Sequence, residues 1–262
     1  MSIKSLLPPF ANRYNLYKFV NPLLRNAFSS ISPRNLVRSA IIQHGIKYLN
    51  LGGYRPTEGY LSIQLSPVEL YGIPTIKHKT TVLKYDETTG EINQQQRILS
   101  TPALSLHFNI LNGLPLDSDS FSGINMSHIL EHFTRDEGLK VLKECYRILE
   151  PGGILRISCP DLLVYAKAYV NRDSSFFDSV PIQKACCYEG LTNYGDRFIS
   201  KAYDNENGHK WFYDAESAIQ LLHEAGFSKA QEKKVHESNL PNIEVVEPGF
   251  RAVESFYVES IK

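Results

Sequence analysis

Residues 121–160 contain a strand, a helix and a second strand in direct succession, and no other feature of the chain constrains the fold as strongly. The run FSGINMS at the start of this stretch is typical of a buried strand. Thr134 and Glu137 have the spacing of a capping box, which marks the start of a helix. A Pro-Gly-Gly turn is expected to end that helix, and ILRISCP follows as the next strand. Two strands of one sheet joined through a helix must be parallel, so the sequence predicts an α/β domain.

The remaining segments fit the same domain. Apolar runs at 46–51, 60–65 and 103–110 are expected to form earlier strands. Residues 66–103 are polar and rich in turn residues, with DETTGE as a hairpin tip or loop. DAESAIQLLHEAGF has helical spacing and ends at Gly226, and SKAQEKKV and FRAVESFYVES are expected to close the chain as strands. We count about seven strands and no internal repeat, which indicates one α/β domain over 46–262.

Composition excludes several classes of protein. Hydrophobic residues make up 42% of the chain and the net charge is zero, so the chain is not intrinsically disordered. No apolar run approaches the roughly 20 residues that a membrane span needs. The four cysteines form no C-x-x-C pair and no secretory leader is evident, which argues against a disulfide scaffold and a zinc ribbon. We therefore expect a cytoplasmic protein with reduced thiols.

Charge is distributed unevenly along the chain. Residues 1–57 contain eight Lys or Arg and no Asp or Glu, so the remainder carries 20 basic against 28 acidic residues. We expect 1–45 to be a basic helical extension interrupted by prolines. Such a tract can be a transit peptide, a membrane-surface arm, a nucleic-acid arm or an extension that packs on its own acidic domain, and the last is favoured. Nucleic acid is not expected as a partner, because the acidic remainder has no basic-aromatic stripe, but peripheral membrane contact through the arm stays open.

Two motifs follow predicted strands, where ligands of open α/β sheets bind. Gly52 and Gly53 end the first strand and allow backbone N–H groups to approach a ligand, although a plain turn needs glycine equally. His128, Glu131 and His132 match the zinc-peptidase pattern H-x-x-E-H. That pattern requires a helix, whereas here a strand runs into the motif and the helix starts after it, so we predict no metal. Glu131 and His132 then either pin a turn by hydrogen bonds or form a polar wall or base beside a ligand.

Together these segments resemble a known family. LPLDSDSFSGINMSHILEHFTRDEGLKVLKECYRILEPGGILRISCPDL resembles the second half of class I S-adenosylmethionine-dependent methyltransferases. The chain is most similar to small predicted bacterial methyltransferases with LNLG, LEH and PGG motifs, and GHKWFYDAESAIQLLHEAGF resembles their closing helix and its lead-in. The resemblance covers 46–260. It implies a Rossmann-like, mostly parallel seven-stranded sheet with helices on both faces and an antiparallel last strand.

The resemblance also implies where S-adenosylmethionine would bind. The glycine loop would hold the methionine part, Gln64 would face the ribose, Asn109 would face the adenine, and the end of the fourth strand would lie near the sulfur. The implied cofactor residues are Leu51, Gly52, Gly53, Gln64, Asn109, Ile110, Ser127 and His128.

Three positions depart from the family pattern. Tyr54 stands where a glycine is expected, and Gln64 and Asn109 replace two acids. Charged hydrogen-bond partners are worth about twice neutral ones. Loss of both acids could weaken cofactor binding by about 1–3 kcal/mol.

Methyl transfer to a hydroxyl requires a base and an aligned acceptor. Candidate bases are His132, Asp161 and His209, of which Asp161 is also a suitable N-cap for the following helix. Residues 161–210 form an insert expected to build the acceptor site. Its mixture of Tyr, Asn, Asp and His suits a polar small molecule or a saccharide. The candidate acceptor contacts are Asn193, Tyr194, Trp211 and Tyr213.

The sequence thus predicts a methyltransferase that acts on a small polar or saccharide acceptor, with O-methylation preferred. The alternative is a noncatalytic protein of the same fold that binds a partner, which the two substituted acids favour. A dinucleotide oxidoreductase is disfavoured because G-x-G-x-x-G and its acid are missing.

Overall fold

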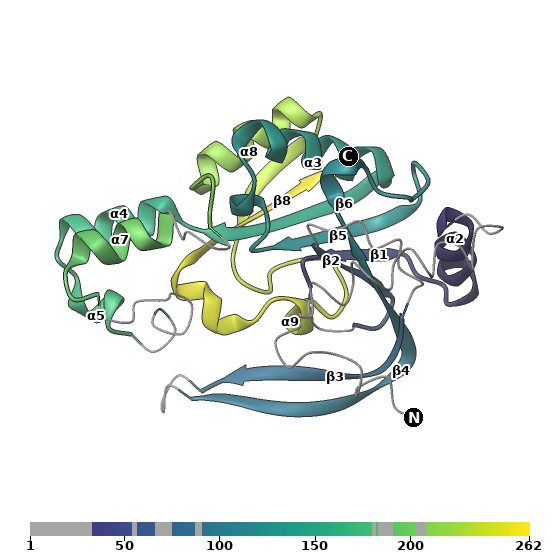
Figure 1. Ribbon diagram of the computed structural model, residues 1–262, viewed down its shortest axis with the longest axis horizontal. Coiled ribbons are helices and arrows are strands. Elements are labelled where there is room, and N and C mark those ends of the chain that lie inside the picture. The colour runs from purple at the N-terminus through teal and green to yellow at the C-terminus, as the bar shows by residue number, and fades with distance from the viewer. Residues whose placement is uncertain are drawn as a thin grey trace, which may run out of the picture.

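The computed structural model describes residues 33–53, 57–65, 75–86, 91–179, 182, 191–202 and 208–262. Most of the basic N-terminal tract, Tyr54 and two of the four cysteines therefore lie outside the described residues. The described part contains one mixed sheet with the strand order β3-β4-β2-β1-β5-β6-β8-β7 (Figure 1). The strands are β1 Tyr48–Leu51, β2 Tyr60–Leu65, β3 Thr75–Tyr85, β4 Ile92–Phe108, β5 Phe121–Ser127, β6 Leu149–Pro160, β7 Ser228–Lys233 and β8 Ser255–Ile261.

The centre of the sheet is parallel. The neighbours β4–β2, β2–β1, β1–β5 and β5–β6 all run in the same direction. The last strand, β8, is antiparallel to both of its neighbours, β6 and β7. This confirms the predicted α/β fold with a mostly parallel seven-stranded sheet and an antiparallel last strand. An eighth strand, β3, adds to one edge by antiparallel pairing with β4.

The β3–β4 hairpin corrects the expectation for residues 66–103. We expected polar loops there, but residues 75–85 and 92–108 are strands. DETTGE does join them, since the amide of Asp86 donates to the carbonyl of Glu91 at 2.9 Å, although 87–90 lie outside the described residues. Residues 93–98 of β4 are all exposed, so this part of the strand has no buried face. Without a buried face there is no apolar alternation for sequence reasoning to detect in it.

Helices α3 and α8 cover one face of the sheet (Figure 1). The predicted capping box is present at α3: the Glu137 amide donates to Thr134 Oγ1 at 3.3 Å, and the Thr134 amide donates to Glu137 Oε2 at 2.9 Å. Gly226 ends α8 in the left-handed region, as predicted. The α-helices are α2 Pro33–Gln43, α3 Arg135–Ile148, α4 Leu162–Val170, α5 Ser174–Phe177, α7 Tyr194–Ala202, α8 Ala215–Ala225 and α9 Ile243–Val246. Three short 3-10 turns are η2 Ile110–Asn112, η3 Leu130–His132 and η4 Gly249–Val253.

The Pro-Gly-Gly turn after α3 differs from its prediction. The helix ends at Ile148, before the turn, and β6 already begins at Leu149. The turn lies inside an irregular part of β6, where the pairing with β5 shifts register. Gly152 adopts φ +82° there, a conformation that favours glycine.

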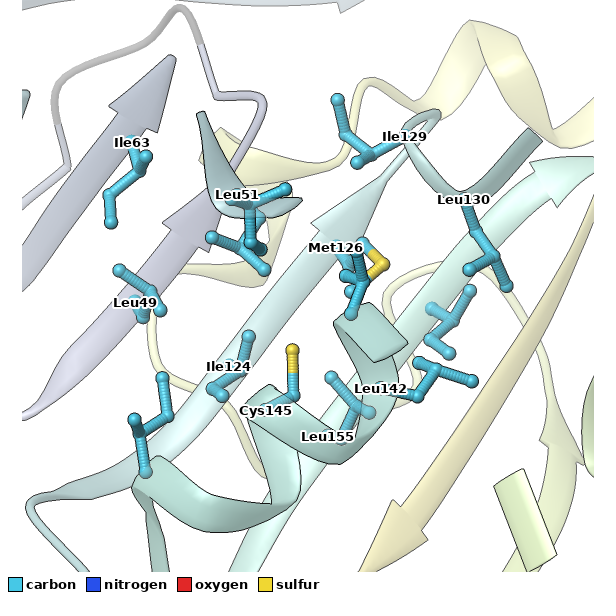
Figure 2. Packing of buried hydrophobic residues seen from close by; sticks show 14 of the residues in the cluster. Leu49, Leu51, Ile63, Ile124, Met126, Ile129, Leu130, Leu142, Cys145 and Leu155 are labelled. Carbon is cyan, nitrogen blue, oxygen red and sulfur yellow. The ribbon is translucent and has the colours of Figure 1, made fainter. Parts of the chain in front are cut away.

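The main hydrophobic core lies between α3, α8 and the sheet. Leu49, Ile124 and Met126 point from the strands towards Leu142 and Cys145 of α3 (Figure 2). All five side chains are completely buried. The core therefore fixes the position of β5, and with it the position of the residues that follow β5.

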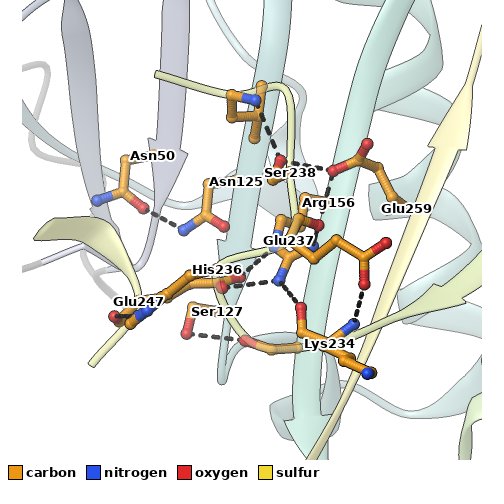
Figure 3. Close-up of polar contacts among 12 residues, drawn as sticks. Asn50, Asn125, Ser127, Arg156, Lys234, His236, Glu237, Ser238, Glu247 and Glu259 are labelled. Carbon is orange, nitrogen blue, oxygen red and sulfur yellow. Dashed lines mark hydrogen bonds and ion pairs between the residues drawn. The ribbon is translucent and has the colours of Figure 1, made fainter. Parts of the chain in front are cut away.

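A different kind of layer covers the opposite face. Residues 234–254, which connect β7 to β8, run across it and include α9. Leu240 and Val246 of this segment pack against Tyr60, whose hydroxyl donates to the carbonyl of Pro241 at 2.8 Å. Beneath the segment, Asn50 and Asn125 form a buried hydrogen bond of 3.1 Å (Figure 3). Short helices and a polar layer thus take the place of long helices on this face.

The connection from β1 to β2 is too short for a crossover helix. Only residues 52–59 separate the two parallel strands, and the structure describes 52, 53 and 57–59 of them. A parallel crossover with a helix needs about a dozen residues or more. The glycine loop at the end of β1 therefore leads directly towards β2.

Helix α2 packs on the domain at the opposite end from α4, α5 and α7 (Figure 1). Val37 of α2 is buried in the main core, and Arg38 lies 3.4 Å from Asp117. This described part of the basic tract contacts an acidic residue of its own domain. Across the described ranges, no helix combines the length and hydropathy that a bilayer crossing requires.

Candidate active site

The carboxyl ends of the parallel strands β1, β5 and β6 meet at one edge of the sheet. Helices α4, α5 and α7 project from this edge, towards which β5 points (Figure 1). Residues that follow these strands are therefore brought together although they are far apart in the sequence. This is the edge at which open α/β sheets bind ligands.

Two glycines follow β1 for identifiable steric reasons. Gly52 adopts φ +73°, and a Cβ added to it would lie 2.0 Å from Cδ1 of Ile129. A Cβ added to Gly53 would lie 1.8 Å from the side-chain nitrogen of Asn50. Both positions thus require glycine for packing within the protein itself.

The predicted adenine contacts lie after β4. Asn109 Oδ1 accepts from the amide of Leu111 at 3.1 Å and so caps η2, which leaves the side-chain NH2 group able to donate to a ligand. Ile110 is 2% exposed and packs in the main core, so only its backbone is accessible. Leu51 is likewise buried. Gln64 lies in β2 beside β4, and its side chain is outside the described set.

Ser127 and His128 end β5 and are both engaged within the protein. The hydroxyl of Ser158 donates to Ser127 Oγ at 2.9 Å. His128 adopts φ 53°, and its Nε2 lies 3.0 Å from Ser255 Oγ of β8. Burial, together with the charge of Arg251, lowers the pKa of the His128 imidazole. The ring is therefore neutral at neutral pH and faces the β6–β8 side of the edge.

Glu131, His132 and His209 form a compact group that we call the Glu131 cluster. Glu131 and His132 lie in η3, directly after β5. The amides of Lys210 and Trp211 donate to the carbonyl of Glu131 at 2.7 and 3.2 Å, which holds the lead-in of α8 over η3. These two bonds bring His209 to the cluster. Its Nε2 lies 3.9 Å from Glu131 Oε1, and its ring meets that of His132 edge-to-face at 5.1 Å.

The carboxylate of Glu131 is buried in an unusual way. The residue is 1% exposed, and neither carboxylate oxygen has a hydrogen-bond partner among the described residues. The nearest imidazole nitrogen, Nδ1 of His128, lies 3.4 Å from Oε1. Burial raises the pKa of Glu131, but His128, His209 and His132 outweigh it and bring the pKa to about 2. The group is therefore an anion at neutral pH.

The imidazole of His209, unlike the carboxylate of Glu131, is uncharged at neutral pH. Burial lowers its pKa to about 4, although Glu131 opposes this. Its Nδ1 is buried and, within the described part of the chain, has no hydrogen-bond partner. At neutral pH the cluster thus combines a carboxylate anion with an uncharged His209 ring that retains a lone pair.

Asp161 follows β6 and caps α4, as the sequence predicts. Its Oδ1 accepts from the amide of Leu163 at 2.9 Å. Burial raises the pKa of this carboxyl above its ordinary value. The cap occupies one oxygen, so a role as a base would depend on the other.

The four predicted acceptor contacts lie in different surroundings in the structure. Trp211 is 44% exposed beside the Glu131 cluster. Tyr213 is 1% exposed in the main core, where no acceptor reaches it, so the expectation that it contacts the acceptor is not supported. Asn193 caps α7 by accepting from the amide of Asp196 at 2.7 Å. Tyr194 packs on Phe177 in a second apolar cluster.

Phe212 connects that second cluster to the Glu131 cluster. Its ring lies 5.6 Å from Tyr165 of α4, 6.3 Å from Phe198 of α7 and 6.5 Å from His209. The insert and the Glu131 cluster therefore share one wall. Asn193 and Tyr194 contribute to the insert's own packing rather than to that wall.

The sequence did not predict the environment of the Glu131 side chain. We expected its side chain either to pin a turn by hydrogen bonds or to line a ligand, and the structure shows no side-chain hydrogen bond for it among the described residues. The absence of a zinc-peptidase helix is confirmed, because His128 is in the left-handed region and only residues 130–132 form a 3-10 turn. The H-x-x-E-H pattern was the available signal, but nothing in the sequence indicated that His209 completes the group.

Residues 75–157 match the model of a methyltransferase domain. The match spans β3 to most of β6, including β5, η3 and α3, and begins after the glycine loop. Comparison with curated proteins gave no match.

Among solved structures, the chain is similar to three SAM-dependent methyltransferases. One from Archaeoglobus fulgidus has 13% identity over 92% of this chain and 98% of that chain, with a TM-score of 0.40. One from Mesorhizobium loti has 15% identity over 88% and 98%, with a TM-score of 0.42. One from Methanosarcina mazei has 16% identity over 86% and 96%, with a TM-score of 0.40.

Proposed function

Because this chain carries a class I S-adenosylmethionine-dependent methyltransferase domain, we propose that it methylates a hydroxyl oxygen of a small polar acceptor, with a saccharide as the preferred class. The observation that carries the proposal is the position of the Glu131 cluster. It lies at the carboxyl edge of β5, beside the exposed ring of Trp211 and against the insert. Hydroxyl chemistry needs such polar groups next to the cofactor's methyl group.

Cofactor binding is proposed for the edge formed by β1, β2, β4 and β5. Gly52 and Gly53 are proposed to hold the methionine part, since both are partly exposed and neither carries a side chain that would shield its backbone. The free NH2 group of Asn109 would donate to an acceptor nitrogen of the adenine ring. Gln64 is proposed to meet the ribose, and the end of β5 at Ser127 and His128 to lie near the sulfur.

Bound S-adenosylmethionine supplies an electrophilic methyl group, which leaves S-adenosylhomocysteine behind when it is transferred. The protein's own residues must orient the acceptor and remove its hydroxyl proton. His132 and His209 are the proposed acceptors of that proton, because both imidazoles lie beside Glu131 at the strand ends, with their ring centroids 5.1 Å apart. Asp161 is a second candidate with its uncapped oxygen. Trp211 offers an exposed aromatic face, a surface on which the apolar face of a sugar ring packs.

The proposal is tested by methyl transfer from labelled S-adenosylmethionine to acceptor panels that differ in one functional group. Matched hydroxyl, amine and thiol compounds are compared, with mono- and disaccharides among the hydroxyl compounds. We expect labelled product from hydroxyl acceptors, and a fall in kcat of about 10²–10⁴-fold for His132→Gln. His78→Gln, an exposed position in β3, is the control and should retain full activity. Transfer only to amines or thiols would contradict the proposal.

A noncatalytic, partner-binding protein is the second candidate, and one contact favours it. A Cβ added at Gly52 would lie 2.0 Å from Cδ1 of Ile129, so Ile129 packs against the loop that is proposed to hold the cofactor. Calorimetry with S-adenosylmethionine and S-adenosylhomocysteine separates the two functions. Saturable one-site binding supports the enzyme, whereas no heat from a folded sample at millimolar ligand supports the partner-binding protein.

A further inference from the structure

The Glu131 cluster contains the donor set of a metal site. One carboxylate oxygen and two imidazole nitrogens, from Glu131, His132 and His209, all lie within 4.8 Å of one another. Two imidazoles and one carboxylate are a ligand set used by zinc enzymes and by non-haem iron sites. We propose that these three residues bind one divalent first-row transition ion, with Zn²⁺ as the preferred occupant.

The distances allow coordination after a small contraction. With metal–ligand bonds of about 2.0–2.2 Å in a tetrahedral site, the donor atoms lie about 3.4 Å apart. The widest separation in the cluster, 4.8 Å, must therefore shorten by about 1.4 Å, which is within the reach of side-chain torsions. The backbone already holds the ligands in place, because the amides of Lys210 and Trp211 bond to the carbonyl of Glu131.

An independent observation points to a cation at this place. Both carboxylate oxygens of Glu131 and Nδ1 of His209 are buried, and none has a hydrogen-bond partner in the described part of the protein. The 3.4 Å contact with His128 Nδ1 is long for a hydrogen bond, and buried carboxylates in proteins are normally well hydrogen-bonded or bound to a metal. A cation between Glu131 Oε1 and His209 Nε2, which lie 3.9 Å apart, would satisfy the carboxylate.

The neighbouring cations do not fulfil this role. Lys210 Nζ lies 3.2 Å from Glu137, and Lys201 Nζ lies 3.0 Å from Glu254. Both lysines are therefore paired with carboxylates other than that of Glu131.

His128 is a positioning residue for the site. Its Nδ1 lies 3.4 Å from Glu131 Oε1, and its Nε2 lies 3.0 Å from Ser255 Oγ. It connects the carboxylate to β8, as second-shell hydrogen bonds orient the ligands of other metal sites. The ligand set thus has a support that does not depend on the insert.

Three protein ligands leave at least one position open on the metal. If the proposed function holds, the hydroxyl oxygen of the acceptor occupies this open coordination position. The metal lowers the pKa of the hydroxyl, its proton passes to water, and the oxygen then forms the bond to the methyl carbon as the carbon–sulfur bond breaks. His132 and His209 then act as ligands instead of bases.

The test is titration of the full chain after removal of metals with a chelator. Zn²⁺ is titrated by calorimetry, and Co²⁺ is titrated by visible absorption, which reports a four-coordinate nitrogen and oxygen site. We expect one ion per chain, with affinity lowered at least about a hundredfold in both Glu131→Gln and His209→Gln. His78→Gln is the matched control, since it removes an exposed histidine of β3, and its affinity should not change.

Circular dichroism and thermal unfolding show whether each variant is folded, so that a loss of affinity can be told apart from a loss of structure. His132→Asn provides a further ligand variant, and Zn²⁺ should raise the Tm of the parent chain but of none of the three ligand variants. No saturable binding to the folded parent chain, or binding that all three variants retain, would overturn the inference. Metal binding without methyl transfer to any acceptor contradicts the proposed function alone, because the two readouts are independent.

Discussion

Arg156 of β6 and Glu247, the residue after α9, form a buried bidentate ion pair (Figure 3). Nε lies 2.6 Å from Oε1 and Nη2 lies 2.9 Å from Oε2, and neither residue is more than 1% exposed. Arg156 also donates to the carbonyls of Glu237 and Lys234 at 2.9 and 3.0 Å. One side chain thus binds the connecting segment 234–254 to the sheet at three places.

Breaking this pair should destabilise the protein strongly. Glu247→Gln removes the bidentate partner of Arg156 and leaves only the longer 3.6 Å contact with Glu259, and we expect a loss of about 3–5 kcal/mol in the free energy of unfolding. Replacing both residues, by Arg156→Met with Glu247→Leu, should recover part of that loss because the buried guanidinium is removed together with its bidentate partner. Urea unfolding of the two single variants and the double variant measures the coupling. A loss below about 1 kcal/mol in Glu247→Gln would show that solvent reaches the pair.

The carboxyl of Glu254 should make stability fall in acid. Burial raises its pKa, but Lys201, Arg251 and His128 together lower the pKa to about 2, from 4.5 in the unfolded chain. The stabilisation is therefore complete above 4.5 and disappears as the pH falls from 4.5 towards 2. Unfolding free energies of the parent and Glu254→Gln should differ most at about pH 6 and converge only towards about pH 2. A difference that is independent of pH would contradict this origin.

Two glycine substitutions separate backbone strain from loss of the cofactor site. Gly52→Ala and Gly152→Ala both place a side chain at positive φ, which costs roughly 1–2 kcal/mol. Only the first also overlaps a neighbour, since nothing lies within 4 Å of a Cβ at Gly152. We expect calorimetry to show lost S-adenosylmethionine binding in Gly52→Ala and normal binding in Gly152→Ala. Normal binding in both variants would place the cofactor away from this loop.

The closeness of Ile129 to Gly52 predicts that one substitution will increase cofactor affinity. Ile129→Ala empties the space beside the glycine, so cofactor affinity should rise severalfold while the free energy of unfolding falls by about 2–5 kcal/mol. Calorimetry and urea unfolding on the same sample measure both effects. Weaker binding in this variant would mean that Ile129 itself contacts the cofactor.

Local signals predicted the central part of the fold. The capping box at Thr134 and Glu137, the cap at Asp161 and the left-handed end at Gly226 all appear as expected. Each depends on residues within a few positions of one another, so the sequence is sufficient to define it.

The cluster at the strand ends depends on distant pairs instead. Glu131 and His209 meet only because backbone amides of the α8 lead-in bond to η3 across the sheet edge. The sequence marks His209 as a polar residue of a lead-in segment, but gives no information about its distance from Glu131. Likewise, Arg156 alternates with apolar residues in β6, and nothing nearby indicates that Glu247 is its partner.

The position of β8 between β6 and β7 has a consequence for synthesis on the ribosome. β7 is made before β8 but has no strand to pair with until residues 255–261 emerge. Throughout that interval β6 presents an open, apolar edge, which is the type of surface that associates with other chains. Translation speed over residues 234–261 should therefore influence how much of the protein reaches its native form and how much aggregates.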